Sequence, residues 1–274
     1  MEVEIVTLSK QGGRSYNEDV HGQWHDDRYV ACLVADGAGG HGGGDVAAAI
    51  ARRSVLEGFA SAPGLEAAPL RTLLQQANRD IVARQAEGGR LAAMRSTLVV
   101  AAIDLLDNQL VWAHTGDSRA YLFRDGAQVA RTTDHSLVQQ MVVGGMLDAE
   151  GARLHPQRNV LLSALGSVDE PPDIEVSAPF ALVPGDVLLL CSDGVWELLG
   201  DAGLLALLRA SRNASQWIEE IDRQVAASAK PGHDNYTAVA MWLHMEGDLT
   251  LLMPGQGQDV GESTESREGR DQGS

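Results

Sequence analysis

The sequence predicts an α+β fold in which β-sheets are covered by helices, and three observations support this prediction. Short apolar or β-branched runs, bounded by residues that favour turns, recur along the chain and indicate strands. Several segments with helical spacing of apolar residues lie between these strands. No internal repeat and no linker interrupts this alternation, so we expect one large domain with sheets covered by helices.

Eight segments carry the strand pattern, because each is an apolar or β-branched run closed by Gly, Asp, Asn or Pro. These segments are Val3–Ser9, Tyr29–Ala35, Ser96–Ile103, Gln109–His114, Arg119–Arg124, Ile174–Ser177, Asp186–Cys191 and Tyr236–Leu243.

Five segments carry a helical pattern. They are Gly44–Ala60, Pro69–Glu87, Ser136–Val143, Gly203–Ala210 and Ser215–Ala227. The last is the clearest, because Trp217, Ile218, Ile221 and Val225 recur at helical spacing and form one apolar stripe. Ser136, or Asp134 before it, is placed to cap the helix that follows.

Composition and charge exclude several classes of protein. Hydrophobic residues make up 44% of the chain, and no apolar run is long enough to span a bilayer. The N-terminal residues lack the pattern of a secretory signal, so we expect a cytoplasmic protein. The net charge of −17 disfavours nucleic acid and anionic membranes as partners. Cys32 and Cys191 lie in apolar runs and are expected to be buried free thiols, the alternative being a disulfide in an oxidising compartment.

The chain is expected to divide into a folded body, residues 1–245, and an acidic tail, residues 246–274. The tail is rich in Gly, Gln, Ser and acidic residues and has few apolar ones after Met253. Such a composition favours disorder.

Four aspartates, Asp36, Asp117, Asp193 and Asp234, lie at the ends of expected strands. Carboxylates that converge at strand ends repel one another unless a cation is present, and oxygen ligands suit Mg²⁺ or Mn²⁺. Each Asp-Gly pair alone also fits an ordinary turn. The segment 36–44 fits that alternative less well, because six of its nine residues are glycine. Such a segment indicates backbone that approaches another group closely.

Eight motifs, in order and at plausible intervals, carry a resemblance to a known family. They are Arg14-Ser-Tyr-Asn17-Glu18-Asp19, Asp36-Gly-Ala-Gly-Gly-His41, Met94-Arg-Ser96-Thr97, Gly116-Asp117-Ser118-Arg119-Ala120-Tyr121, Thr133-Asp134-His135-Ser136, Leu165-Gly166, Ser192-Asp193-Gly194-Val195 and Asp234-Asn235-Tyr-Thr237. The set resembles the bacterial branch of the type 2C, or PPM, metal-dependent protein phosphatases. It covers the body from about residue 12 to 239 and implies a four-layer αββα sandwich with two mainly antiparallel central sheets flanked by helices.

The resemblance implies a ligand set for two core ions, Mn²⁺ or Mg²⁺. Asp36 resembles the carboxylate that bridges both ions, and the Gly37 carbonyl is expected to bind one of them. Asp193 and Asp234 resemble ligands of the other ion. Two ions roughly 3.5–4 Å apart can activate a shared water for in-line attack on phosphorus, so no protein nucleophile is required.

The same resemblance implies roles around these ligands. Asp19 would order water in the outer shell, with Glu18 supporting it. Asp117, with Asp193, would hold a third and weaker ion. Arg14 resembles the arginine that binds the substrate phosphate, a role that its planar guanidinium suits.

The proton donor to the leaving group stays open at this point. Many relatives place a histidine directly after the Asp-Gly pair, where this chain has Ala38. His41 and a metal-bound water are the alternatives. Residues 143–159 correspond to a flap beside the cleft, and His135 is expected to have a structural role.

The predicted activity is hydrolysis of phosphoserine or phosphothreonine in proteins. The predicted partners are a phosphorylated protein substrate and a cognate Ser/Thr kinase, with no nucleic acid, no membrane and a monomeric state. Two alternatives stay open. One is a pseudophosphatase, which predicts gaps in a ligand set that is complete here; the other is a phosphatase of small phosphate esters.

Overall fold

The structure, a computed structural model, describes residues 1–39, 42–245 and 247. One sheet has the strand order β10-β7-β6-β3-β2, with β11 also pairing with β7. Its strands are β2 (Val20–His25), β3 (Tyr29–Ala35), β6 (Leu98–Asp104), β7 (Gln109–Thr115), β10 (Glu175–Val176) and β11 (Phe180–Ala181). Every pairing in this sheet is antiparallel.

The second sheet has five strands in the order β1-β13-β12-β8-β9. They are β1 (Glu2–Lys10), β8 (Arg119–Arg124), β9 (Ala127–Arg131), β12 (Val187–Cys191) and β13 (Tyr236–His244). These pairings are antiparallel as well, and β13 lies between the first strand of the chain and β12.

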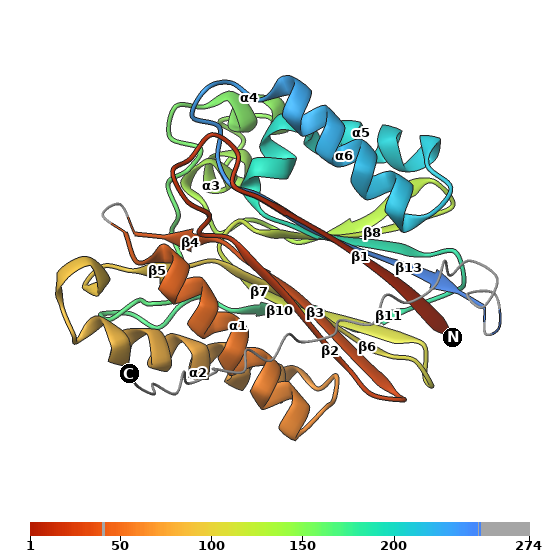
Figure 1. The fold of residues 1–274 in the computed structure, drawn as a ribbon, viewed down its shortest axis with the longest axis horizontal. Coiled ribbons are helices and arrows are strands. Elements are labelled where there is room, and N and C mark those ends of the chain that lie inside the picture. The colour runs from red at the N-terminus through yellow and green to blue at the C-terminus, as the bar shows by residue number, and fades with distance from the viewer. Residues whose placement is uncertain (40–41, 246, 248–274) are drawn as a thin grey trace, which may run out of the picture.

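Two pairs of long helices cover the outer faces of the sheets (Figure 1). Helices α1 (Gly44–Ser61) and α2 (Ala67–Gln85) cover the six-stranded sheet, and α5 (Asp193–Ala210) and α6 (Ala214–Ser228) cover the five-stranded sheet. The chain therefore has the four-layer sandwich that the sequence predicts.

Side-chain alternation along the strands builds three apolar layers. On β3, Leu33 packs into the layer beneath α1 and α2, while Cys32 and Val34 face the other sheet. On β12, Leu189 packs beneath α5 and α6. Strands that are apolar on both faces, such as β3 and β12, are therefore central strands of a sandwich.

Shorter elements lie at one end of the sandwich. They are β4 (Gly37–Ala38), β5 (Arg95–Ser96), the 3₁₀ helix Gly89–Leu91, α3 (Leu137–Val143) and α4 (Ala149–Leu154). The Ser136 side chain accepts a hydrogen bond from the Gln139 amide and so caps α3, as expected. Cys32 and Cys191 are buried free thiols, as expected.

The sequence-based assignment of elements was incomplete. It omitted β2, β4, β9, β11, α4 and the 3₁₀ helix Gly89–Leu91. It also began the helix that precedes α6 at Gly203, whereas α5 begins at Asp193. Ser192-Asp193-Gly194 is therefore a helix N-terminus and not a turn. The helix is interrupted at Gly200, where φ is 63°, which explains why only its second half showed a helical pattern. The predicted tail, apart from Gly247, lies outside the described residues.

Candidate active site

Antiparallel pairing brings several strand ends to the same end of the sandwich. Val20 at the start of β2 pairs with Ala35 at the end of β3, and Cys191 at the end of β12 pairs with Ala238 and Arg119. The aspartates beside these strand ends are Asp19, Asp36, Asp117, Asp193 and Asp234. Residues far apart in the sequence thus meet at one edge of both sheets.

Charge repulsion at Asp36 indicates that these carboxylates lie close to one another. Asp36 is densely surrounded by protein atoms, and burial raises the pKa of its carboxyl well above the usual value. Asp19, Asp193, Asp117 and Asp234 raise this pKa further through charge repulsion. Repulsion by four neighbouring carboxylates favours either protonation of Asp36 or a bound cation.

Asp193 has the same environment on the other side of the site. It is 8% exposed, and burial raises the pKa of its carboxyl well above the usual value. Repulsion from Asp117, Glu197 and Asp234 acts in the same direction. Glu197 lies one helical turn after Asp193 in α5, so the first turn of this helix presents two acids to the site.

Asp19 is held in place from the opposite sheet. The Ser192 hydroxyl donates a hydrogen bond of 2.6 Å to Asp19 Oδ2, and Ser192 Oγ accepts one from the Thr237 amide. Burial raises the pKa of Asp19 to about 6, although the hydrogen bond from Ser192 lowers it. The hydrogen bond holds Asp19, which precedes β2, beside the segment that joins β12 to Asp193 in α5.

Asp117 lies in the turn between β7 and β8 and is 5% exposed. Burial raises the pKa of its carboxyl to about 7, and nearby Asp134 raises it further while Arg119 lowers it. The Trp196 indole donates a hydrogen bond of 3.0 Å to the Asp117 carbonyl, and the Arg119 guanidinium lies 3.5 Å from the Trp196 ring centre. The turn is thereby fixed against α5.

Unpartnered oxygens indicate what the site accepts. Asp19 Oδ1, Asp193 Oδ1 and Glu18 Oε1 are buried and have no hydrogen-bond partner. Burial also raises the pKa of Glu18, while backbone amides at the start of α1 lower it. Buried anionic oxygens without partners are costly in a folded protein. Divalent cations with oxygen ligands fit this donor set.

The Asp36 backbone is fixed by β-strand neighbours. The Asp36 carbonyl accepts hydrogen bonds from the Thr97 amide (2.8 Å) and the Ser96 hydroxyl (3.1 Å), and its amide donates to Thr97 Oγ1. At Gly37 a Cβ would lie 2.2 Å from the Gly44 carbonyl oxygen. The glycine-rich segment was predicted to approach another group closely. At Gly37 that group is the backbone of Gly44.

Arg14 and Asp234 form an ion pair, with Arg14 Nη2 2.6 Å from Asp234 Oδ2. Asn235 holds the loop that carries Arg14, because its side chain donates to the carbonyls of Gln11 and Tyr16 and accepts from the Glu18 amide. The phosphate-binding candidate is thus anchored beside a metal-ligand candidate.

The structure brings together Arg14, Glu18, Asp19, Asp36, Asp117, Asp193 and Asp234, and Gly37 follows Asp36 in β4. Among the described residues, Asp36, Asp193 and Asp234 do not bring three ligand oxygens within 4.8 Å of one another. Asp234 Oδ2 is instead bonded to Arg14. His41 lies outside the described residues, so its position relative to the site is not described.

Sequence reasoning missed Glu197, Ser192 and Asn235 as parts of the site. Glu197 would have been found if α5 had been predicted to begin at Asp193, because acids at positions i and i+4 of a helix share a face. Ser192 and Asn235 were quoted within motifs, but their hydrogen bonds join segments more than 170 residues apart, and no local pattern predicts such bonds.

The pattern of the family described as Protein phosphatase 2C matches residues 9–243. The chain belongs to this family. Its members are metal-dependent hydrolases that dephosphorylate proteins. The family that the eight sequence motifs predicted is thereby confirmed.

Individual relatives agree with this assignment. The serine/threonine phosphatase Stp of Listeria monocytogenes is 34% identical over 243 residues, which cover 86% of this chain and 92% of that protein. The crystal structure of PstP/Ppp from Mycobacterium tuberculosis has a TM-score of 0.72 and 29% identity, with coverage of 89% and 99%. A structure of the PstP catalytic domain with two manganese ions has a TM-score of 0.72 and 28% identity, with coverage of 89% and 99%.

None of the helices in the described part of the chain is both long and apolar enough to cross a membrane.

Proposed function

We propose that this protein phosphatase 2C member hydrolyses phosphoserine and phosphothreonine in proteins with two ions held by Asp36, Gly37, Asp193 and Asp234. The observation that carries the proposal is the cluster of buried carboxylates that raise one another's pKa and leave Asp19 Oδ1 and Asp193 Oδ1 without partners. Outside this cluster, buried Asp104, Asp134 and Asp186 are each paired with an arginine. In the cluster only Asp234 has an arginine partner, Arg14. No ion pair with a basic side chain is found for Asp19, Asp36 or Asp193 among the described residues, so these three carboxylates suit metal ions.

The remaining acids are assigned supporting roles. Asp19, oriented by Ser192, orders water at the ions, and Glu18 supports it from the start of α1. Asp117 and Asp193 together hold a third, weaker ion, since Asp117 adds to the negative potential at Asp193. When bound, the ions would supply Lewis-acid activation of a water molecule that attacks phosphorus.

Arg14 binds the phosphate of the substrate. Its guanidinium can donate two parallel hydrogen bonds to phosphate oxygens and offset the negative charge of the transition state. In this structure it is bonded to Asp234, so Asp234 must exchange the arginine for an ion before both residues can act. Metal binding and the release of Arg14 for phosphate are therefore coupled.

The metal is Mn²⁺ or Mg²⁺. The donor set consists of carboxylates and a backbone carbonyl, which are hard oxygen ligands. PstP with two manganese ions has a similar fold and provides a precedent for this metal.

A titration of phosphothreonine-peptide turnover with Mn²⁺ tests the proposal. Wild type should require the ion and lose activity in EDTA, and Asp193→Asn should lose activity at all Mn²⁺ concentrations. Turnover that survives both EDTA and this substitution would contradict the proposed mechanism. Comparing the peptide with a small phosphate ester separates a protein phosphatase from a phosphatase of small molecules, and a pseudophosphatase would act on neither.

The cellular setting follows from this activity. The substrate is a phosphorylated protein, and a Ser/Thr kinase in the same cytoplasm supplies it. The net charge of −17 disfavours nucleic acid and anionic membranes as partners. The protein acts as a monomer, which light scattering at micromolar concentration would check.

A further inference from the structure

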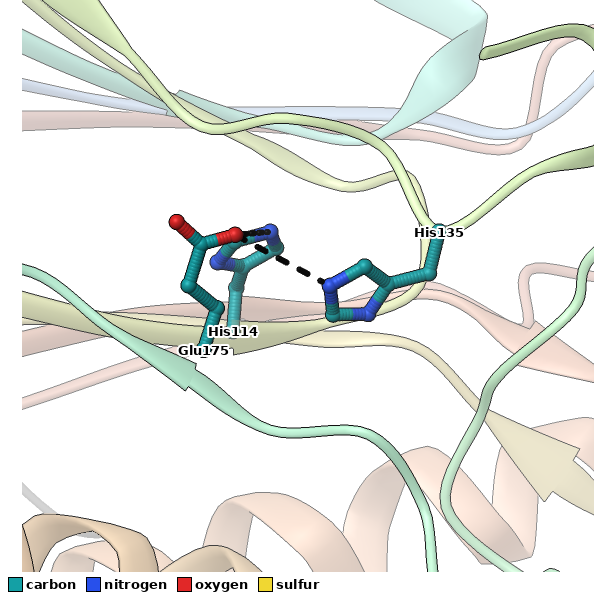
Figure 2. A group of neighbouring side chains, drawn as sticks. All are labelled: His114, His135 and Glu175. Atoms are coloured by element: carbon teal, nitrogen blue, oxygen red, sulfur yellow. Dashed lines mark ion pairs between the residues drawn. The ribbon is translucent and has the colours of Figure 1, made fainter. Parts of the chain in front are cut away.

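A second group of ligand-type side chains lies near the active site. His114 is close to the end of β7, Glu175 begins β10, and His135 lies between β9 and α3. Glu175 and His114 are paired residues in the β10–β7 ladder. Figure 2 shows the Glu175 carboxylate beside His114, with the His135 ring facing the same carboxylate oxygen.

The distances bring these groups almost to coordination range. The Nε2 atoms of His114 and His135 lie 3.9 and 4.0 Å from Glu175 Oε2. One ligand atom from each residue falls within 4.8 Å of the other two. The rings lie 4.7 Å apart with an interplanar angle of 22°.

Both imidazoles have the charge state that binds metals, although coordination through Nε2 requires the proton to lie on Nδ1. Burial lowers the pKa of His114 and of His135, so each ring is neutral at pH 7. Glu175 and Asp173 act in the opposite direction on His135, and Asp134 and Asp173 do so on His114. These acids also make the surroundings of the two rings negative, which favours a cation.

His114 carries an unsatisfied nitrogen. Its side chain is 1% exposed, and Nε2 is 2.8 Å from the Thr133 carbonyl oxygen. The ring therefore donates from Nε2, which leaves a lone pair on Nδ1, a buried atom without a partner. A buried imidazole lone pair without a donor loses the hydrogen bond it had in water.

We propose that His114, His135 and Glu175 form a metal site, distinct from the aspartate site, that binds a borderline divalent ion of the Zn²⁺ class. Two imidazoles, one carboxylate and a water in the fourth position are a ligand set that Zn²⁺ accepts. The aspartate site offers only oxygen, so the two sites select different metals.

Coordination requires a tautomer change at both rings and a small change in distance. At His114 the proton would move from Nε2 to Nδ1, and the hydrogen bond to the Thr133 carbonyl would be lost. Tetrahedral Zn²⁺ with bonds of about 2.0–2.2 Å places its ligand atoms roughly 3.4 Å apart. The present separations of 3.9 and 4.0 Å exceed this by about half an ångström. Glu175 is 56% exposed, so its side chain can move inwards and the ion can enter from solvent.

A zinc ion bound at this site would change the turn that carries Asp117. This effect on the active site rests on the proposed function. His135 Nδ1 now accepts a hydrogen bond of 3.3 Å from the Gly116 amide, next to Asp117. If His135 binds a metal through Nε2, its proton must reside on Nδ1, which then faces the Gly116 N–H. The hydrogen bond is lost, and the turn that carries Asp117 shifts.

Zinc titration by calorimetry, in saturating Mg²⁺ to fill the aspartate site, tests the proposal. Wild type should bind one equivalent that is lost, or weakened at least tenfold, in Glu175→Gln and His135→Gln. Glu175 is exposed, so its substitution leaves the fold intact even if a buried histidine cannot be replaced. His25→Gln, an exposed histidine outside the cluster, is the matched control and should bind as wild type.

Two results would overturn the proposal. The first is unchanged zinc binding in both cluster variants. The second is zinc binding that disappears in Asp193→Asn but not in Glu175→Gln, which would place the ion among the aspartates. Because calorimetry measures binding without turnover, a failed zinc site and a failed phosphatase proposal give separate results. The Gly116 amide resonance should shift on zinc addition in wild type and not in Glu175→Gln.

Discussion

Strand β12 has a buried aspartate near each of its ends, and the two have opposite environments. Asp186, directly before the strand, is fully buried and binds Arg124 through two hydrogen bonds of 2.7 Å. Asp193, two residues after the strand, is 8% exposed, has an unpartnered oxygen and faces other acids. The Asp186–Arg124 pair stabilises the fold. The charge of Asp193 destabilises the metal-free fold, and a bound metal ion would offset this repulsion.

The largest expected effect is on turnover at the unpaired end. Asp193→Asn removes a charge that the proposed ions require, so kcat/KM for a phosphothreonine peptide should fall by about 10³-fold or more, equivalent to roughly 4 kcal/mol. Steady-state kinetics across a Mn²⁺ series measures this effect. Asp186→Asn is the matched control at the other end of β12, and its folded fraction should retain kcat. Equal losses in both variants would mean that the ends do not differ in function.

The next largest effect is on stability at the paired end. Asp186→Asn leaves the Arg124 guanidinium without its charged partner and weakens two hydrogen bonds. The free energy of unfolding should therefore fall by about 3 kcal/mol. For a domain of this size the midpoint of thermal unfolding should fall by about 10 °C. Metal-free Asp193→Asn should show the opposite sign, a higher midpoint than metal-free wild type. A lower midpoint in both variants would remove the distinction.

Arg14 tests the coupling between the ion-paired and metal-bound arrangements of Asp234. Arg14→Ala should lower kcat/KM by about 10²-fold, mostly through KM, because phosphate loses a bidentate partner. It should also tighten Mn²⁺ binding, since Asp234 no longer exchanges an arginine for the ion. Arg14→Lys should recover less than half of the lost transition-state free energy. Mn²⁺ binding that is unchanged in Arg14→Ala would separate the ion pair from the metal site.

The smallest expected effect is a pH dependence of the metal-free protein. Burial raises the pKa of Asp117 to about 7 and of Asp19 to about 6, so the folded state holds protons that the unfolded chain has released. Their favourable contribution is complete below about pH 4 and is lost as the pH rises through 6 to 7.

In metal-free protein, Asp117→Asn should therefore raise the unfolding midpoint at pH 8 by roughly 3–6 °C, from about 1–2 kcal/mol, and should raise it by less at pH 5, where the folded protein holds the proton. Calorimetry at both pH values measures the difference. A stabilisation at pH 5 as large as at pH 8 would show that the charge of Asp117 is not its cause.

The sequence predicts the central strands better than the edges. Tyr29–Ala35 and Arg119–Arg124 match β3 and β8 residue for residue, because central strands of a sandwich are apolar on both faces. The edge strand β2, with His21, Gly22 and Gln23, lacks that pattern and was missed. Likewise the Asp-Gly pair at the start of α5 looked like a turn, because local chemistry favours a turn there while packing against β13 selects a helix.

The acids of the candidate site could be identified from motifs, but their partners could not. Asp19 depends on Ser192, and Arg14 depends on Asp234, in each case across more than 170 residues. Such contacts are set by strand order, which local patterns do not encode. His114 and Glu175 also meet only because β10 pairs with β7.

The position of β13 between β1 and β12 delays completion of the five-stranded sheet during synthesis. This strand joins β1 to β12, and Asp234 and Asn235 at its start complete the site and hold the N-terminal loop. During synthesis, β1 has no partner strand until the ribosome has released β13, which ends at His244. Sheets closed by such distant pairings fold slowly. We therefore expect a nascent chain to have no phosphatase activity, and to depend on chaperones, until this late strand inserts between its two neighbours.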